Sequence, residues 1–267
     1  MKQSLLDQIL ENKRNEVQLA KEKNSLESLQ HTLSDRKTEI RNFFAALGTP
    51  SRLHVIAEIK KASPSEKVIE PNFNPLEIAL LYQNSGLVDA ISILTDEKYF
   101  SGKLSYIRDI KNITKVPLFR KDFIIDEYQI YESYLAEADA ILLIAHILEP
   151  VELQNLIQLT KKLGLQCLVE TRNKAEIEMA VQAGTEIIGI NARNLDTLEM
   201  NKHLFADLVS SIPTGILKVA ESGLESSHDL QEVAAAGADA VLIGTTLMRA
   251  KNKKAKLEEL LSFERAQ

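Results

Sequence analysis

The chain has 267 residues and a formal net charge of −6, with 45% hydrophobic and 26% charged residues. This composition is ordinary for a globular protein, and a chain of this length can bury a large core without disulfides or a structural metal. Lysines and acids are interspersed, so the sequence predicts no one-sign face and argues against nucleic-acid or membrane partners. A small phosphorylated ligand is compatible with this charge, because one anion needs only a local positive site.

Cysteine usage and hydropathy indicate the compartment. The one cysteine, Cys167, excludes an intramolecular disulfide, and its apolar neighbours favour a buried strand residue over a nucleophile. The N-terminus lacks the apolar core of a signal peptide, and no apolar run approaches the roughly 20 residues of a membrane helix. We therefore expect a cytoplasmic protein.

The first 50 or so residues differ from the rest of the chain. Leu5, Ile9 and Val17 stand among charged residues, and residues 38–47 form a second amphipathic stretch. We interpret both as helices that precede the main fold and cover its surface with their apolar faces. So short a segment would have a marginal core alone. The prediction is one domain over 1–267, with helices in 1–50 and a barrel in 51–267.

Short apolar runs then alternate with amphipathic stretches. The runs are rich in Val, Ile and Leu, as in parallel strands buried on both faces, and comprise residues 54–59, 88–94, 116–119, 140–144, 166–169, 186–190, 217–220 and 240–243. Helical spacing separates them, with Asn173 and Ser226 as plausible caps. Eight β-α units predict an α/β fold, a closed (β/α)8 TIM barrel with an N-terminal helical extension. The alternative is a doubly wound open sheet, which usually has fewer strands and a glycine-rich first turn; residues 60–65 contain no glycine.

Polar residues follow nearly every apolar run, where a (β/α)8 barrel carries its active site. They include Lys60, Lys121, Glu170, Asn191, Arg193 and Glu221, and the first run itself carries Glu58. Solvated strand ends would look similar, but Glu58 and Lys60 are two residues apart and point to the same side of their strand. A charge inside a barrel must be paired or used. A structural ion pair between Glu58 and Lys60 is the alternative to a catalytic role.

The last two runs end in small residues. Ser222 and Gly223 follow the seventh run, and Gly244 and Thr245 follow the eighth. Small residues allow close backbone approach, and the loops after strands 7 and 8 are the recurrent phosphate site of this fold. The sequence therefore predicts a phosphorylated small-molecule substrate.

At these residues the chain resembles the indole-3-glycerol phosphate synthase family. The motifs that carry the resemblance occur in family order, at residues 56–65, 94–100, 120–126, 190–195, 219–223 and 242–248. The resemblance implies ring closure, decarboxylation and dehydration of 1-(2-carboxyphenylamino)-1-deoxyribulose 5-phosphate, without cofactor or metal. It also implies an enzyme of tryptophan biosynthesis.

The resemblance also implies residue roles. Lys121 would be the general acid for the keto oxygen, Lys60 would support substrate charge, and Glu170 would serve the dehydration. Glu58, Asn191, Arg193 and Glu221 would position the sugar and the catalytic groups. The phosphate end would be lined by Ser63, Ser222, Gly223, Gly244 and Thr245, and the apolar slot for the aromatic ring by Phe123, Leu142 and Leu195. Because both lysines must release a proton near neutral pH, we expect their pKa values to be lowered.

The chain departs from the family at two places. Glu66 and Lys67 replace the usual Lys-Gly after the first strand, which stiffens that loop and changes its charge. His146 stands where the family usually has a small or apolar residue, and we interpret it as a strand-end histidine without a catalytic role.

Other functions compatible with the pattern are a neighbouring phosphate-binding barrel, such as phosphoribosylanthranilate isomerase or tryptophan synthase α, and a catalytically inactive barrel. The first two lack the Glu58–Lys60 pair joined to the motif at Lys121, and they lack the long N-terminal extension. Intact Lys60, Lys121 and Glu170 argue against an inactive barrel. The modest charge favours a monomer.

Overall fold

The computed structural model describes residues 4–34, 38–49, 52–64 and 66–263. Within these ranges eight parallel strands form a closed barrel in the order β1-β10-β9-β8-β7-β6-β5-β4. Their bounds are β1 His54–Ile59, β4 Ala90–Leu94, β5 Leu118–Lys121, β6 Ala140–Ile144, β7 Gln166–Thr171, β8 Ile187–Asn191, β9 Leu217–Glu221 and β10 Ala240–Ile243. The predicted barrel is confirmed, and a doubly wound open sheet is excluded. The predicted boundary at 50–51, the chain ends of the predicted domain and Ser65 lie outside the described residues.

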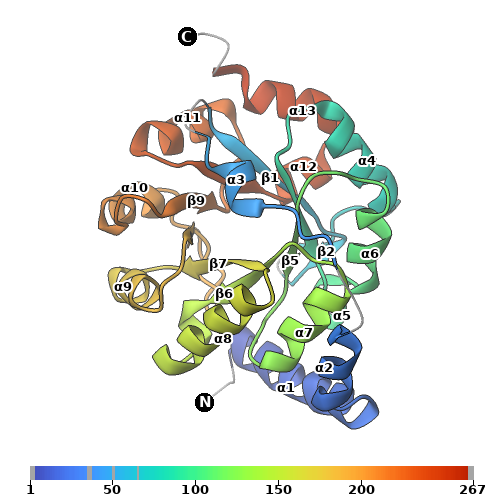
Figure 1. Cartoon of the computed structure of the whole chain (residues 1–267). Helices are drawn as coiled ribbons and strands as arrows, with labels where there is room; N and C mark the ends of the chain where they lie inside the picture. The colour runs from blue at the N-terminus through green and yellow to red at the C-terminus, as the bar shows by residue number, and fades with distance from the viewer. Residues whose placement is uncertain (1–3, 35–37, 50–51, 65, 264–267) are drawn as a thin grey trace.

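Helices form a ring around the barrel (Figure 1). The ring consists of α4 Pro75–Ser85, α6 Ser105–Lys111, α7 Glu127–Leu135, α8 Pro150–Lys162, α9 Lys174–Gln182, α10 Leu204–Leu208, α11 Ser227–Ala236 and α13 Lys253–Leu260. Shorter elements follow β4, β6 and β10, namely α5 Glu97–Phe100, η1 Ala145–Ile147 and α12 Thr245–Arg249, and η2 Val209–Ser211 follows α10. Asn173 and Ser226 cap α9 and α11 as predicted, since each side chain accepts a hydrogen bond from a first-turn backbone N–H.

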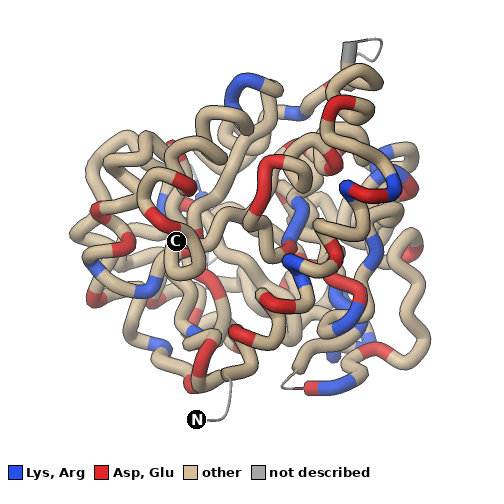
Figure 2. The backbone as a smooth tube through the Cα atoms, turned by 90° about the horizontal axis from the view of Figure 1, so that it is seen from below, with Lys and Arg blue, Asp and Glu red and all other residues tan. Residues whose placement is uncertain are grey.

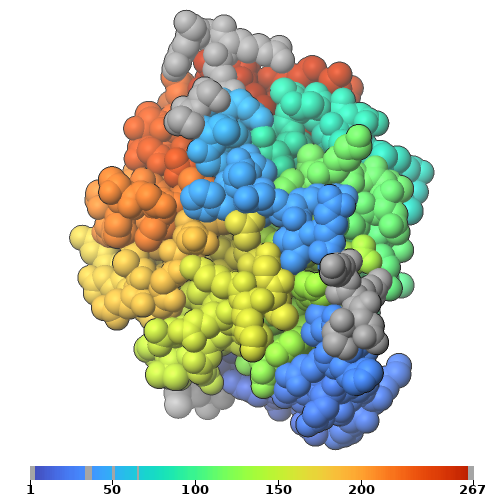
Figure 3. All heavy atoms as spheres, in the orientation of Figure 1, coloured from blue at the N-terminus to red at the C-terminus, as the bar shows by residue number. Residues whose placement is uncertain are grey.

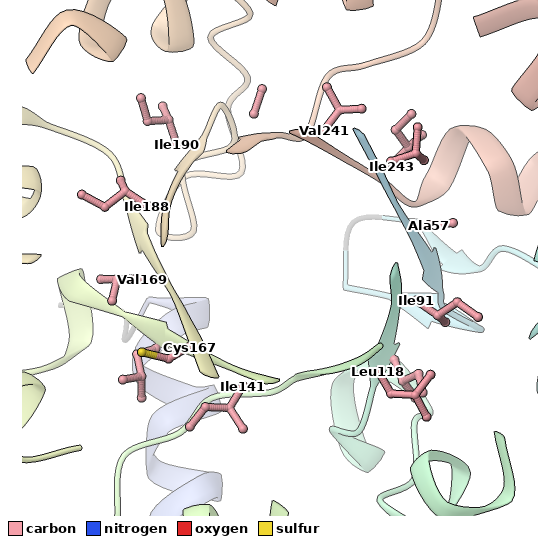
Figure 4. Close-up of a cluster of buried hydrophobic side chains, with 14 of the residues drawn as sticks. Ala57, Ile91, Leu118, Ile141, Cys167, Val169, Ile188, Ile190, Val241 and Ile243 are labelled. Carbon is pink, nitrogen blue, oxygen red and sulfur yellow. The ribbon is translucent and has the colours of Figure 1, made fainter. Parts of the chain in front are cut away.

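The strands are buried on both faces, which explains their nearly continuous apolar runs. One set of alternate side chains points outward to the helices, among them Ala57, Ile91, Ile141 and Cys167 (Figure 4). The other set fills the barrel interior, with apolar side chains at Ile56, Phe119, Ala140, Leu142, Leu168, Val219 and Leu242. The inward series continues toward the carboxyl ends with Glu58, Lys121, Glu170, Asn191 and Glu221, because side chains two residues apart share a face. The alternation of side chains along each strand thus places these polar groups inside the barrel at its carboxyl end.

The N-terminal segment contacts the barrel at both ends. Helix α1, Leu5–Lys23, places Leu6 and Ile9 against the interior cluster, and α2, Leu26–Ser34, packs on α7. Helix α3, Phe43–Leu47, closes the opposite end of the barrel, where Phe43 stacks on Phe119 with ring centroids 5.3 Å apart. In Figure 3 blue atoms of this part of the chain cover the middle of that face. The N-terminal helices therefore do more than cover the barrel surface, which is the role that the sequence predicted. Helix α3 acts as a plug that closes one end of the barrel, and α1 forms a wall at the other end.

The loop after β1 contains a short hairpin of β2, Ala62–Ser63, and β3, Lys67–Val68. Glu66 in this hairpin forms an ion pair with Arg249 at the end of α12. This ion pair connects the loop after β1 to the end of α12, which follows β10.

The structure agrees with the two predictions made from charge and hydropathy, which are the absence of a one-sign face and of a membrane helix among the described residues. Basic and acidic positions are interspersed along the backbone (Figure 2). In the part of the chain that the structure describes, no helix has the length and apolar character needed to cross a membrane.

Candidate active site

A cavity of about 190 Å³ lies at the carboxyl end of the barrel. Every site residue predicted from the sequence lines it: Glu58, Lys60, Ser63, Lys121, Phe123, Leu142, Glu170, Asn191, Arg193, Leu195, Glu221, Ser222, Gly223, Gly244 and Thr245. The structure therefore brings all of them together around one opening, as the spacing predicted.

Lys121 lies at the centre of the polar part. Its Nζ is 2.8 Å from Glu170 Oε2 and 3.0 Å from Glu221 Oε2, so one ammonium bridges the ends of β5, β7 and β9. The second carboxylate oxygen of each glutamate, Oε1, is buried and has no hydrogen-bond partner within the described part of the chain. Acceptor capacity is therefore left for a ligand in the cavity.

The expected lowering of the lysine pKa values is wrong for Lys121. Burial lowers the pKa of Lys121, but attraction by Glu170, Glu221 and Glu58 outweighs burial and raises that pKa above its ordinary value. For the neighbouring carboxylate the effect of burial has the opposite sign. Burial raises the pKa of Glu221 to about 7, while the attraction of Lys121 opposes this rise and the negative charge of Glu170 adds to it. Sequence reasoning missed this balance because it counted the lysines and the carboxylates separately.

The second lysine pairs with the first strand's own carboxylate. Lys60 Nζ is 2.7 Å from Glu58 Oε2. A Cβ on Gly244 would lie 2.1 Å from Glu58 Oε2 and 3.1 Å from Lys60 Nζ, so glycine at this position leaves room for the ion pair, and a larger residue would displace the Glu58 carboxylate. The ion pair predicted as an alternative exists, and it lies inside the cavity next to the small residues. Glu58 and Lys60 can thus form an ion pair with each other and still contact a ligand in the cavity.

Gly189 supports the site residue Glu221 in a way that sequence reasoning missed. A Cβ at this position of β8 would lie 2.1 Å from Glu221 Oε1 and 2.7 Å from Leu168 Cδ2. The neighbouring strand therefore leaves space for the Glu221 carboxylate. A glycine inside a strand pattern is the signal that indicates such a close approach.

The apolar side of the cavity has a wall that the sequence did not assign. Phe123, Leu142 and Leu195 are joined there by Phe100 and by Leu5, Leu6 and Ile9 of α1. Rings of Phe100 and Phe123 have centroids 6.2 Å apart. The amphipathic pattern of α1 predicted a buried face but did not indicate which part of the barrel that face covers.

The loops after β8 and β9 shape the remaining side. Asn191 Oδ1 accepts a hydrogen bond from the backbone N–H of Arg193 at 3.0 Å, and Arg193 Nη1 donates to the Leu198 carbonyl. Ser222 and Gly223 have φ angles of +67° and +73°, which turn the chain sharply after β9. Asn191 thus also supports the loop that carries Arg193 and Leu195.

Two residues stand apart from the cavity. Cys167 is buried among helix-facing side chains, and burial raises the pKa of its thiol to about 12, in agreement with a core role (Figure 4). His146 lies in η1, with Nδ1 3.3 Å from Glu176 Oε1 and Nε2 3.2 Å from Asp196 Oδ2. It therefore belongs to a polar cluster on the rim. Among the described residues, no group of three or more His, Cys, Asp and Glu side chains is arranged to hold a metal ion.

A closed parallel barrel with lysines and glutamates converging on an apolar-walled mouth defines a TIM-barrel enzyme. Solved barrels share this fold at low identity. Thiamine phosphate pyrophosphorylase from Pyrococcus furiosus has a TM-score of 0.59 at 15% identity, covering 80% of this chain and 96% of that one. The 3-hexulose-6-phosphate synthase from Salmonella typhimurium also has a TM-score of 0.59 at 15% identity, with 79% and 97% covered.

Sequence comparison gives the family. The family model of indole-3-glycerol phosphate synthase matches residues 6–260. Proteins of that name from Sulfurimonas denitrificans and Alkaliphilus metalliredigens are each 43% identical over 258 residues, covering 96% and 97% of this chain and 98% of each relative. The chain belongs to the indole-3-glycerol phosphate synthase family, the carboxy-lyases of tryptophan biosynthesis. The neighbouring barrels considered as alternatives are thereby set aside.

Proposed function

We propose that this mouth converts 1-(2-carboxyphenylamino)-1-deoxyribulose 5-phosphate to indole-3-glycerol phosphate, carbon dioxide and water. The observation that carries the proposal is Lys121 held between Glu170 and Glu221 beside an apolar wall. An aromatic ring fits such a wall, and an ammonium flanked by carboxylates can donate and recover protons within one cavity.

Ring closure needs a proton at the keto oxygen. The aromatic carbon that bears the carboxylate attacks the keto carbon, the C=O electron pair moves to oxygen, and Lys121 donates a proton to it. Because its carboxylate neighbours raise the pKa of Lys121, the ammonium is present across the neutral range before substrate binds. A buried ammonium also stabilises the developing oxyanion more than it would in water.

The later steps use the same groups. Carbon dioxide leaves and returns the electron pair to the ring. Glu170 then takes a proton from the CH2 carbon next to the hydroxyl-bearing carbon, the C=C bond of the indole ring forms, and this proton passes to the departing hydroxyl group, which leaves as water. Lys121 regains its own proton from solvent. The Oε1 atom of Glu170 is buried and unpartnered within the described chain, while Oε2 is held by Lys121. We assign Glu58, Asn191, Arg193 and Glu221 to positioning of the sugar and of these groups.

The substrate's two ends fit opposite sides of the cavity. Phe123, Leu142 and Leu195 contact the aromatic ring, together with the apolar residues of α1. Lys60 neutralises charge at the other side, where Gly244 leaves space beside its ammonium. There the phosphate binds backbone N–H groups and hydroxyls of Ser63, Ser222, Gly223, Gly244 and Thr245.

The direct test is an assay of the purified chain with the anilino-ribulose phosphate, followed by indole fluorescence. We expect steady formation of a fluorescent product and release of one carbon dioxide for each. Absence of product from pH 6 to pH 9 would contradict the proposal and favour an inactive barrel.

We further propose that residues 1–267 act as one domain, as a monomer in the cytoplasm. The interior contacts of α1 and α3 support the single domain, since either helix alone would expose its apolar face. Sedimentation of the purified chain tests the oligomeric state, and a dimer at micromolar concentration would contradict it.

A further inference from the structure

Lys13 in α1 is a buried lysine outside the proposed catalytic set. Its exposed fraction is 4%, and it lies on the same face of α1 as Leu6, Ile9 and Val17. Its Nζ is 2.6 Å from Glu16 Oε2, 3.0 Å from Asp96 Oδ2 and 2.9 Å from Asp122 Oδ1. One ammonium thus joins a helix from the start of the chain to two separate strand ends.

The first strand-end partner of Lys13 is Asp122, at the carboxyl end of β5. Asp122 directly follows Lys121, and its Oδ1 also accepts the backbone N–H of Phe123 at 2.8 Å. Asp122 Oδ2 accepts from Thr95 Oγ1 at 2.6 Å and lies 3.0 Å from Arg120 Nη2. The Asp122 carboxylate therefore holds the Phe123 backbone N–H just after β5 and the side chains of Thr95 and Arg120.

Asp96 holds the neighbouring strand end in the same way. It follows β4 and caps α5 by accepting the backbone N–H of Tyr99 at 2.8 Å. The Tyr99 hydroxyl in turn donates to the Gln8 carbonyl of α1 at 3.2 Å. Lys13 and Tyr99 thus connect α1 to the β4 end, one or two helical turns from Leu6 and Ile9, which line the cavity.

Stability alone is a poor explanation for this arrangement. Removing an ammonium and two carboxylates from water is costly, and well-packed apolar side chains often stabilise a fold as much as a buried ion pair does. The rest of this face of α1 is apolar. A buried charge does supply a fixed geometry, since each partner must meet it at hydrogen-bond distance.

We propose that Lys13 is a positioning residue, which sets the place of Lys121 and Phe123 through Asp122 and at the same time seats the apolar wall of α1 on the cavity. It touches neither the substrate nor the reacting atoms. Through Lys13, one helix fixes both the proton donor and the ring-binding wall, so the distance between them is held constant. The inference rests on the proposed function, because it concerns the same site.

The test compares Lys13→Met with Lys21→Met in the full chain. Lys21 is on the same helix and pairs with Asp126 at 2.7 Å, but its side chain is 33% exposed. We expect Lys13→Met to lower kcat by about tenfold or more, because small misplacements of catalytic groups are costly, with KM changed less. We expect Lys21→Met to change kcat by less than about twofold, as exposed ion pairs contribute little. Circular dichroism and the melting temperature show that both variants are folded at the assay temperature.

A second variant covers the case in which Lys13→Met does not fold. Asp96→Asn removes one charge next to Lys13 and keeps the acceptor oxygen for Tyr99. It should lower kcat by about threefold or more and, combined with Lys13→Met, should cause less than the product of the two separate losses. Unchanged kcat in folded Lys13→Met, or in Asp96→Asn if the former is unfolded, overturns the inference. An inactive parent chain would instead overturn the proposed function, so the two failures are distinguishable.

Discussion

Charge balance around Lys121 is the residue-scale feature on which the proposed chemistry depends. Three carboxylates, Glu58, Glu170 and Glu221, face Lys121 and Lys60 in a largely buried mouth. Burial, together with the negative charges of Glu170 and Glu58, raises the pKa of Glu221 against the opposing attraction of Lys121. The sequence indicated which groups converge, but not which of them holds the proton, because that depends on distances of about 3 Å between different strands.

The raised pKa of Glu221 has a consequence for stability. Burial raises this pKa from 4.5 to about 7, so the folded chain binds a proton that the unfolded chain releases between these values. The contribution of Glu221 to stability is therefore present below pH 4.5 and is lost as pH rises through 7. Glu221→Gln imitates the protonated form. Its free energy of unfolding, relative to the parent, should rise from pH 5 to pH 8 by at most about 1.4 kcal/mol per pH unit.

Urea unfolding at several pH values measures this difference. The exposed change Glu178→Gln serves as the control, because its side chain lies on the outer face of α9. The difference in unfolding free energy between Glu221→Gln and the parent should rise with pH. If it falls with pH, or changes as it does for Glu178→Gln, the raised pKa of Glu221 is contradicted.

Gly189 tests the close approach of Glu221. In Gly189→Ala the new methyl group would displace the Glu221 carboxylate and Leu168. We expect kcat/KM to fall by about 10- to 100-fold, and the free energy of unfolding to fall by about 1–3 kcal/mol. In the Glu221→Ala background the same change should cost much less activity, since the displaced carboxylate is absent. Equal losses in both backgrounds would show that Gly189 acts elsewhere.

At the scale of elements, the strands could be predicted more fully than the N-terminal helices. The apolar runs gave all the barrel strands, and the strands β5, β7, β8 and β9 extend one or two residues further than those runs, so that they include Lys121, Glu170, Asn191 and Glu221. A polar residue pointing inward does not break a strand, although it ends an apolar pattern. For α1 and α3 the periodicity showed a buried face without its partner, because docking depends on tertiary contacts far along the chain.

The plug at the closed end gives a prediction for α3. Phe43 is fully buried and stacks on Phe119 inside the barrel, so Phe43→Ala should lower the free energy of unfolding by about 3–5 kcal/mol. The next residue, Phe44, is only partly buried, and Phe44→Ala should cost clearly less. Denaturant unfolding compares the two variants. Equal losses of unfolding free energy in Phe43→Ala and Phe44→Ala would contradict the role of Phe43 in closing this end of the barrel. Loss of enzyme activity in a Phe43→Ala variant that is still folded would also contradict it, because the active-site cavity lies at the opposite end.

At the scale of the whole molecule, the fold and the convergence of the site could be predicted together. Strand parity and the common direction of parallel strands place Glu58, Lys121, Glu170 and Glu221 at one end, whatever the loops do. The contributions of Lys13, Leu6 and Ile9 could not be predicted, because nothing in a local pattern specifies which strand ends a preceding helix meets. The barrel supplies the chemistry, and the N-terminal segment completes the cavity around it.

The most direct test of the account measures kcat and KM of Lys121→Ala and Glu170→Gln with the anilino-ribulose phosphate. Because we propose that both side chains transfer protons in the reaction, we predict that kcat falls by about 10²- to 10⁴-fold in each variant while KM changes by less than about tenfold. Turnover within about threefold of the parent in either folded variant would contradict the central claim that Lys121 and Glu170 carry the proton transfers.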